Sequence, residues 1–149
     1  MAEQLLSGTY RVVGRDFERG GEVSTEIKAL LQKLEIDPAV VRRAVIVVFE
    51  AEMNVVMYAD EATITFELTD EDIGITVEDR GPGIPDIEMA MQEGWSTATD
   101  EMREMGFGLG MGLPNIKRNS DELQIDSVVG QGTVVRSRIR LDEPQRTHG

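Results

Sequence analysis

The most informative stretch of the sequence is Ile75-Thr76-Val77-Glu78-Asp79-Arg80-Gly81-Pro82-Gly83-Ile84. It starts as an apolar run that fits a buried strand, and it ends in an acid followed by two glycines around a proline. A carboxylate at the end of a strand, where the chain turns sharply, suits a specificity contact in a pocket. Glycine lets the backbone approach a ligand where a side chain would collide. The pattern Asp-x-Gly-x-Gly also occurs in plain turns, so a purely structural turn stays open from this stretch alone.

Length and composition fit one globular domain. The chain has 149 residues, of which 40% are hydrophobic and 29% charged, which is enough for one core and leaves little room for two. We expect a single domain over residues 1–149, with a core from about 5 to 141 and a disordered tail over 142–149.

The formal net charge of −13 argues against several classes of partner. A field of that sign disfavours nucleic acid and anionic membrane surfaces. A nucleotide site would have to act locally, through backbone N–H groups, a metal ion or a few basic side chains. No apolar run reaches membrane-spanning length and there is no cysteine, so we expect a cytoplasmic protein without disulfides.

Hydrophobic periodicity predicts a two-layer arrangement. The Asp37-Pro38 pair is a helix-start signature, and a long apolar segment follows it. The β-branched run at 45–48 would also fit a strand, but the segment is long and no turn residue interrupts it. The predicted elements are an edge strand at 5–13, helices at 22–34 and 38–58, strands at 61–68 and 73–78, a short helix within 86–92, a helix from the glycine-rich stretch to about 118–120, and strands at 123–128 and 133–141. This order predicts an α+β fold, a two-layer α/β sandwich with a mixed, mostly antiparallel sheet and helices on one face.

The long helix carries Glu50 and Asn54 four residues apart, with Glu52 between them in the sequence. Positions i and i+4 share one face of a helix, and this face also holds apolar residues. Buried carboxylate and amide groups need partners. The pair could serve a ligand, or it could be satisfied by its own contacts or by water.

The stretch Gly106-Phe107-Gly108-Leu109-Gly110-Met111-Gly112-Leu113 has four glycines at alternate positions. Such spacing does not fit the interior of an ordinary strand or helix. A helix follows directly, and its N-terminal N–H groups suit an anion such as a phosphate chain. A flexible hinge is the alternative. The Gly-Lys-Ser/Thr ending of a Walker loop is absent, and no strand leads into the stretch as a dinucleotide fingerprint requires.

Together these segments resemble the conserved boxes of the GHKL ATPase/kinase superfamily, which has the Bergerat ATP-binding fold of histidine-kinase-like ATPase domains. The resemblance is carried by Glu50-x-x-x-Asn54, Asp79-x-Gly81-x-Gly83, the glycines at 106–112 and Gly130-x-Gly132-Thr133, in that order. Over residues 23–141 the chain resembles the anti-sigma-factor serine/threonine kinases, or switch kinases, of bacterial partner-switching systems. Its Gly-Leu-Pro ending at 112–114 is more similar to kinases that activate a phosphatase than to those that hold a sigma factor.

This resemblance implies a role for each matching residue. Asp79 would accept a hydrogen bond from the exocyclic amine of adenine, assisted by Thr133. Asn54 would bind Mg²⁺, and Glu50 would act as general base. The residues of the ATP-binding site would then be Asn54, Asp79, Gly81, Gly83, Gly108, Gly110, Gly112 and Thr133.

The resemblance also places an ATP lid at residues 93–105. Three basic residues lie closest to the glycine stretch and are candidates to offset phosphate charge, although solvation is the expected use for most of them: Arg103, Lys117 and Arg118. Trp95 and the methionines of this region fit apolar packing.

The implied activity is ATP-dependent phosphorylation of a seryl or threonyl hydroxyl on a small antagonist protein, with a sigma factor or a phosphatase as the regulated target. Kinases of this type are often homodimers. Two alternatives stay open: a non-catalytic ATP-binding partner switch, and an ATPase domain related to histidine kinases. The only histidine is His148 near the C-terminus, so the chain does not offer its own phospho-acceptor in a dimerisation helix.

Overall fold

The computed structural model describes residues 3–92 and 112–141. The elements in chain order are β1 (Gln4–Val13), α1 (Glu22–Lys33), α2 (Pro38–Tyr58), β2 (Glu61–Thr69), β3 (Asp72–Arg80), α3 (Ile87–Ala90), α5 (Gly112–Arg118), β4 (Glu122–Val128) and β5 (Gly132–Arg140). Both predicted hairpins form, and every predicted element in the described part of the chain is present.

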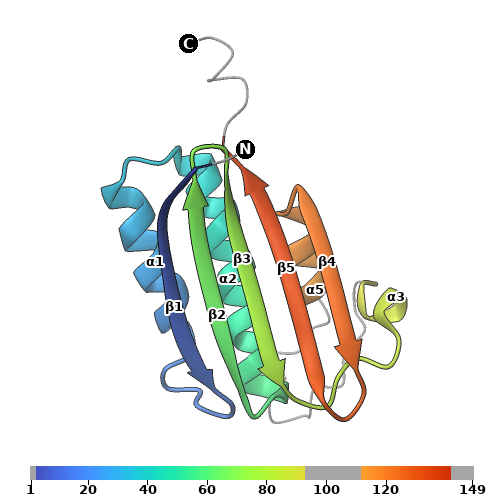
Figure 1. Ribbon diagram of the computed structural model, residues 1–149. Coiled ribbons are helices and arrows are strands. Elements are labelled where there is room, and N and C mark those ends of the chain that lie inside the picture. Colours follow the sequence, from blue (N-terminus) through green and yellow to red (C-terminus); the bar gives the residue numbers. More distant parts are fainter. Residues whose placement is uncertain (1–2, 93–111, 142–149) are drawn as a thin grey trace.

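The five strands form one sheet in the order β1-β2-β3-β5-β4 (Figure 1). All four pairings are antiparallel, so the described part of the sheet is antiparallel throughout. Strand β1 lies at an edge, as its sequence predicts. Strand β3 is central, and its end at Asp79 and Arg80 lies opposite the start of β2.

Helices α1, α2 and α5 cover one face of the sheet, and α2 lies between the other two (Figure 1). Alternate residues of β2 point into the layer between sheet and helices, where Ile64 and Phe66 are fully buried. Helix α2 supplies much of the core from several of its sides. Phe49 is an exception, because it is 40% exposed. No helix within 3–92 and 112–141 is long and apolar enough to cross a membrane.

The start of α2 follows the predicted cap. The Asp37 side chain accepts a hydrogen bond of 2.8 Å from the Ala39 backbone N–H, and Pro38 occupies the first helical position. This arrangement satisfies one of the otherwise unpaired donors of the first turn.

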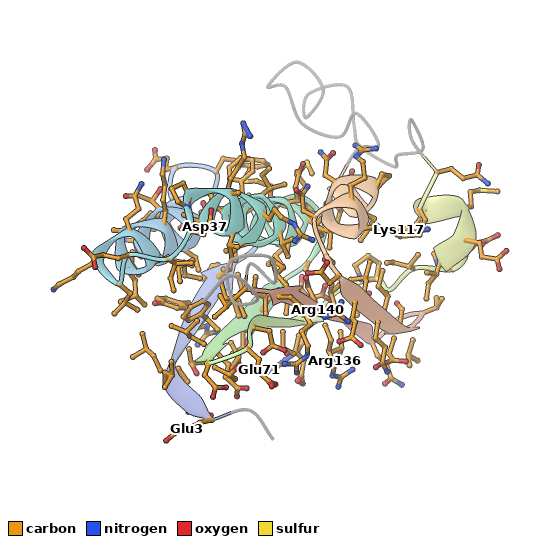
Figure 2. The ribbon with its side chains drawn as sticks, turned by 90° about the horizontal axis from the view of Figure 1, so that it is seen from above. Glu3, Asp37, Glu71, Lys117, Arg136 and Arg140 are labelled. Atoms are coloured by element: carbon orange, nitrogen blue, oxygen red, sulfur yellow. The ribbon has the colours of Figure 1, made fainter. Side chains whose placement is uncertain are left out.

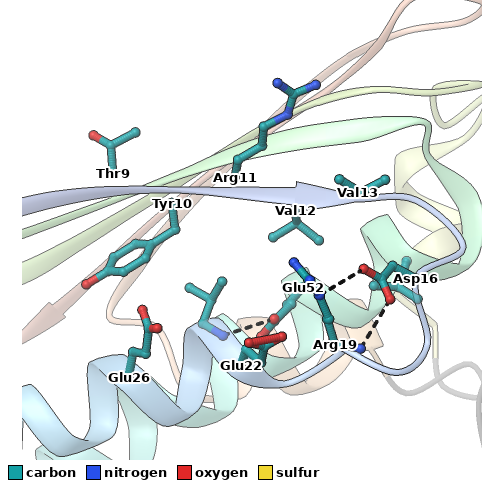
Figure 3. A pocket seen from close by; sticks show the side chains of 12 residues that line it. Thr9, Tyr10, Arg11, Val12, Val13, Asp16, Arg19, Glu22, Glu26 and Glu52 are labelled. Atoms are coloured by element: carbon teal, nitrogen blue, oxygen red, sulfur yellow. Dashed lines mark hydrogen bonds and ion pairs between the residues drawn. The ribbon is translucent and has the colours of Figure 1, made fainter.

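The start of α1 is capped by a residue from another helix. Gly21 precedes α1 in a left-handed conformation and offers no side chain. Instead the Glu52 carboxylate of α2 accepts hydrogen bonds from the backbone N–H groups of Val23 and Ser24, at 3.1 and 3.2 Å. Glu52 is only 1% exposed, and it borders a cavity of about 360 Å³ between β1 and α1 (Figure 3). In the sequence Glu52 lies between the candidate site residues Glu50 and Asn54, and its role as the cap of α1 was not predicted.

The sheet's other face carries charged side chains. Arg136 and Arg140 of β5 lie beneath the sheet, away from the helices (Figure 2). Arg138, from the same row of β5, donates to both carboxylate oxygens of Asp72 at 3.0 Å, and Thr69 also bonds Asp72. These contacts fix the hairpin that joins β2 to β3, at the end of the sheet remote from Asp79.

We expect Glu52 to make the stability of the protein fall as the pH rises above the ordinary glutamate range. Burial raises the pKa of Glu52, although the backbone hydrogen bonds from Val23 and Ser24 oppose this effect. The native state therefore keeps the proton at pH values where the unfolded chain has lost it. Above the unfolded pKa the native state binds more protons, so the free energy of unfolding decreases until the folded pKa is passed. Glu52→Gln should lose this dependence, measured by urea unfolding across a pH series.

Glu26→Gln is the matched control, because it removes one negative charge from an exposed position of α1. It should keep the wild-type pH dependence. Equal pH dependence in wild type and Glu52→Gln would contradict the assignment of the raised pKa to this carboxyl.

Candidate functional site

Three elements that are distant in sequence meet at one end of the sheet. They are the end of α2, the end of β3 and the start of β5. The Asp60 N–H, just after α2, donates to the Arg80 carbonyl at 2.7 Å, and the Gly81 N–H donates to the Gln131 carbonyl at 3.3 Å. The segment after Asp79 is therefore held between the end of α2 and the turn that joins β4 to β5.

Asp79 is bonded directly to Thr133. The Thr133 backbone N–H donates to Asp79 Oδ1 at 3.0 Å, and the Thr133 side-chain oxygen lies 2.8 Å from Ser127 Oγ. Ser127 Oγ also accepts from the Ile84 N–H at 2.7 Å. A polar network thus links β3, the segment after it, β4 and β5. The structure brings together the predicted pair Asp79 and Thr133 and adds Ser127 to them.

Two glycines allow the backbones to approach at this place. A Cβ on Gly132 would lie 2.1 Å from the Asp79 carbonyl oxygen, and one on Gly83 would lie 2.6 Å from the Val128 carbonyl oxygen. Both residues have positive φ, 151° and 77°. A side chain at either position would collide with backbone atoms and would be conformationally strained. Gly83 therefore has a structural requirement in addition to its predicted role at a ligand.

Burial raises the pKa of Asp79, and the hydrogen bond from the Thr133 N–H opposes the increase. The side chain is half-buried, so one part of the carboxylate faces protein. Thr133 bonds Oδ1, and no other protein donor to this carboxylate occurs among the hydrogen bonds of the described residues. The carboxylate has acceptor capacity left for a ligand donor.

Glu50 and Asn54 lie one turn apart on α2, and both meet α5. The Asn115 side chain of α5 donates a hydrogen bond to Glu50 Oε2. A Cβ on Gly112, the first residue of α5, would lie 3.0 Å from Asn54 Oδ1. Both side chains are half-buried. Glu50 and Asn54 therefore both lie beside the start of α5 in the structure.

Several predicted site residues lie outside the described residues. They are Gly108 and Gly110 of the glycine-rich stretch, the proposed lid at 93–105, and Arg103 and Trp95 within it. Lys117 and Arg118 are described and exposed at the end of α5.

Two residues of the site were not found from the sequence. Neither Ser127 nor Asn115 was singled out. A serine in an alternating strand and an asparagine in a helix carry no signal of their own, because their partners come from other elements. The register of β4 against β5, which pairs Ser127 with Thr133, could have suggested the first.

Within 3–92 and 112–141 there is no group of three or more histidine, cysteine, aspartate or glutamate side chains that could hold a metal ion. A cation here would need oxygen ligands from a bound phosphate compound in addition to Asn54. That donor set suits Mg²⁺, which commonly binds one or two protein oxygens together with substrate phosphates and water.

Comparisons with known proteins identify the family of this chain. The family model of histidine kinase-, DNA gyrase B-, and HSP90-like ATPases matches residues 39–144. Serine/threonine-protein kinase RsbT of Bacillus subtilis is 38% identical over 92 residues, which are 59% of this chain and 63% of the relative. The anti-sigma F factor of Caldanaerobacter subterraneus subsp. tengcongensis is 37% identical over 109 residues, 68% of this chain and 73% of the relative.

Solved structures share the fold. The RsbU and RsbW domains of a Mycobacterium tuberculosis protein align with a TM-score of 0.59 and 15% identity, over 90% of this chain and 32% of that one. The histidine kinase AdeS of Acinetobacter baumannii aligns with a TM-score of 0.51 and 16% identity, over 93% of this chain and 70% of that one.

The chain belongs to the histidine kinase-, DNA gyrase B- and HSP90-like ATPase family, whose domains bind ATP. Within that family it is related by sequence to the anti-sigma F factors and to the kinase RsbT, as the motifs predicted. The matched region spans 63% of the length of RsbT.

We expect Gly132→Ala to destabilise the protein more than Gly130→Ala. Both glycines have positive φ, so each substitution carries left-handed strain of about 1–2 kcal/mol. Only at Gly132 would the new Cβ also collide with the Asp79 carbonyl, whereas the surroundings of Gly130 are open. Urea unfolding of the two variants measures the difference. Equal losses would show that β5 can shift away from Asp79 at little cost.

Proposed function

We propose that this protein is an ATP-dependent serine/threonine protein kinase of the partner-switching type. It transfers the γ-phosphoryl group of ATP to a seryl or threonyl hydroxyl on a small antagonist protein. The observation that carries the proposal is the position of Glu50 and Asn54, which share one face of α2 and both meet α5. The similarity to a protein named as a serine/threonine-protein kinase supports the same activity.

Glu50 has the chemistry of the general base. The attacking hydroxyl oxygen forms a bond to the γ-phosphorus, the bond from that phosphorus to the β–γ bridging oxygen breaks, and ADP leaves. The hydroxyl proton passes to the Glu50 carboxylate. Phosphoryl transfer of this kind depends mainly on positioning and on electrostatic stabilisation. A carboxylate beside the acceptor supports transfer to a protein hydroxyl and is not needed for nucleotide binding alone.

Asp79 and Asn54 have complementary roles toward the nucleotide. The Asp79 carboxylate accepts from the exocyclic amine of adenine and so selects it over guanine, which has a carbonyl at that position. Thr133 bonds this carboxylate through its backbone N–H, and its side chain bonds Ser127. Asn54 would hold Mg²⁺ through its side-chain oxygen, and the bound ion would offset phosphate charge. Gly108, Gly110 and Gly112 would contact the phosphates through backbone N–H groups.

The partner is a protein in the cytoplasm that carries the phosphorylated hydroxyl. Its phosphorylation would change how it binds a second protein, either a sigma factor or a phosphatase. The relatives named anti-sigma F factors favour regulation of transcription. The Gly-Leu-Pro ending at 112–114 favours a phosphatase as the target, and a binding assay with both classes would decide between them.

We expect Asp79→Asn to weaken ATP binding by on the order of 10- to 100-fold. The substitution removes a hydrogen bond to a charged acceptor, worth roughly 1.5–3 kcal/mol, and each 1.4 kcal/mol is about tenfold in affinity. Calorimetric titration with ATP and Mg²⁺ measures the loss, and GTP should not bind the wild type. Because burial raises the pKa of Asp79, ATP affinity should also fall on acidification at a higher pH than an ordinary aspartate would give.

Glu78→Gln is the control for this experiment, since it removes the same charge from an exposed neighbour on β3. It should bind ATP as the wild type does. Wild-type affinity in Asp79→Asn, or equal binding of ATP and GTP, would overturn the adenine contact.

We expect Glu50→Gln to bind ATP normally and to lose phosphoryl transfer. A general base contributes typically 10²- to 10⁴-fold to the rate, whereas the glutamine side chain keeps the size but cannot accept the proton. The measurement follows γ-labelled ATP, with transfer to a protein acceptor and basal hydrolysis by water recorded separately. Full activity in Glu50→Gln would rule out the base and favour the non-catalytic ATP-binding switch.

A further inference from the structure

The Asn115 side chain bridges two charged residues. Its amide nitrogen donates to Glu50 Oε2, and its amide oxygen accepts from the Arg118 guanidinium. Asn115 and Arg118 are three residues apart on α5, so they share one side of that helix. A chain of hydrogen bonds therefore runs from Arg118 through Asn115 to Glu50 on α2.

These two hydrogen bonds fix the orientation of the Asn115 side-chain amide. A carboxylate can only accept hydrogen bonds and a guanidinium can only donate them. The amide satisfies both partners in one orientation alone, with nitrogen toward Glu50 and oxygen toward Arg118. Rotation of the amide by 180° would place oxygen against oxygen and nitrogen against nitrogen. The Arg118 contact therefore holds Asn115 in the orientation that Glu50 needs.

We propose that Asn115 is a positioning residue, oriented by Arg118, that holds the Glu50 carboxylate in place to accept the proton of the attacking hydroxyl. This inference rests on the proposed kinase function. In this proposal Arg118 binds Asn115 on the same helix. This role is separate from the offsetting of phosphate charge, for which Arg118 is also a candidate. Asn115 acts through Glu50 and is not itself required to touch the substrate.

An amide suits this position better than a basic side chain would. A direct ion pair between arginine and Glu50 would favour the charged carboxylate and make it a weaker base. The neutral amide fixes one oxygen, Oε2, with a single hydrogen bond. The other oxygen, Oε1, has no partner among the hydrogen bonds of the described residues, and it is the atom that would receive the proton.

The test measures the rate of basal ATP hydrolysis, with Mg²⁺-ATP and water as the acceptor, alongside the affinity for ATP. Asn115→Ala should lower kcat by on the order of 10- to 100-fold, the range seen when a group that orients a reacting residue is removed. ATP affinity should change little, because Asn115 is not in the proposed nucleotide contacts. The loss should stay smaller than that of Glu50→Gln, and the double variant should be no slower than Glu50→Gln alone.

Asn119→Ala is the matched control. Asn119 directly follows α5, and its amide donates to the Asn115 backbone carbonyl at 2.8 Å instead of to Glu50. Its loss should lower the thermal stability and leave kcat near the wild-type value. Arg118→Ala should reproduce part of the Asn115→Ala defect, and Arg118→Lys, which can still donate to the amide oxygen, should restore part of the rate.

A pH profile separates positioning from a general structural role. Asn115→Asp places a second carboxylate beside Glu50, and like charges in contact resist ionising together. The acid limb of the pH–rate profile should therefore move to higher pH. Asn115→Ser, which is small and neutral, should lower the rate without that movement.

The outcomes also distinguish this inference from the function on which it rests. If Glu50→Gln loses hydrolysis but Asn115→Ala keeps wild-type kcat, the positioning role is overturned and the kinase proposal stands. If Glu50→Gln keeps wild-type hydrolysis, both are overturned. Should Asn115→Ala fail to fold, the Arg118 variants and Asn115→Ser provide the same comparison, and wild-type kcat in all of them would overturn the role.

Discussion

The buried Glu52 carboxylate fixes how α2 is turned, and the position of the site depends on this. In an α-helix, residues two positions apart in the sequence differ by about 200° around the helix axis. Glu52 therefore faces away from Glu50 and Asn54. Its two hydrogen bonds attach that side of α2 to the start of α1. A rotation of the helix would unpair a buried carboxylate and two backbone donors, at a cost of several kcal/mol. The opposite side of α2 is thereby directed toward α5, where Asn115 and Gly112 meet Glu50 and Asn54.

A second constraint acts on Asp79. The approach of Gly132 to the Asp79 carbonyl leaves no space for a side chain, and the Thr133 N–H binds the carboxylate from the same strand. The acid is therefore held by β5 before any ligand arrives. An acceptor that is already oriented binds with less loss of side-chain entropy. The end of β3 and the side of α2 are positioned by separate contacts, so the proposed adenine contact and the proposed general base can be altered by separate substitutions.

Local sequence predicted the elements because each signal acts within one segment. The alternation in β2, the Asp37-Pro38 cap and the spacing of Glu50 and Asn54 all concern residues that are neighbours in the chain. The roles of Glu52 and Asn115 could not be predicted in this way, since their partners on other elements lie 28 or 29 and 65 residues away in the sequence. Family resemblance supplied Asp79 and Thr133, and the structure supplied the contact between them.

Three carboxylates have different environments: Glu50 and Asp79 belong to the candidate site, and Glu52 lies on the opposite side of α2. Glu52 is enclosed and bonded to backbone donors, Asp79 is half-buried with one donor, and Glu50 is half-buried against an amide. None of the three has a salt bridge among those of the described residues. Neutral donors can orient an acid without cancelling its ability to accept a proton or a hydrogen bond, whereas a paired cation would favour the ionised form and reduce basicity.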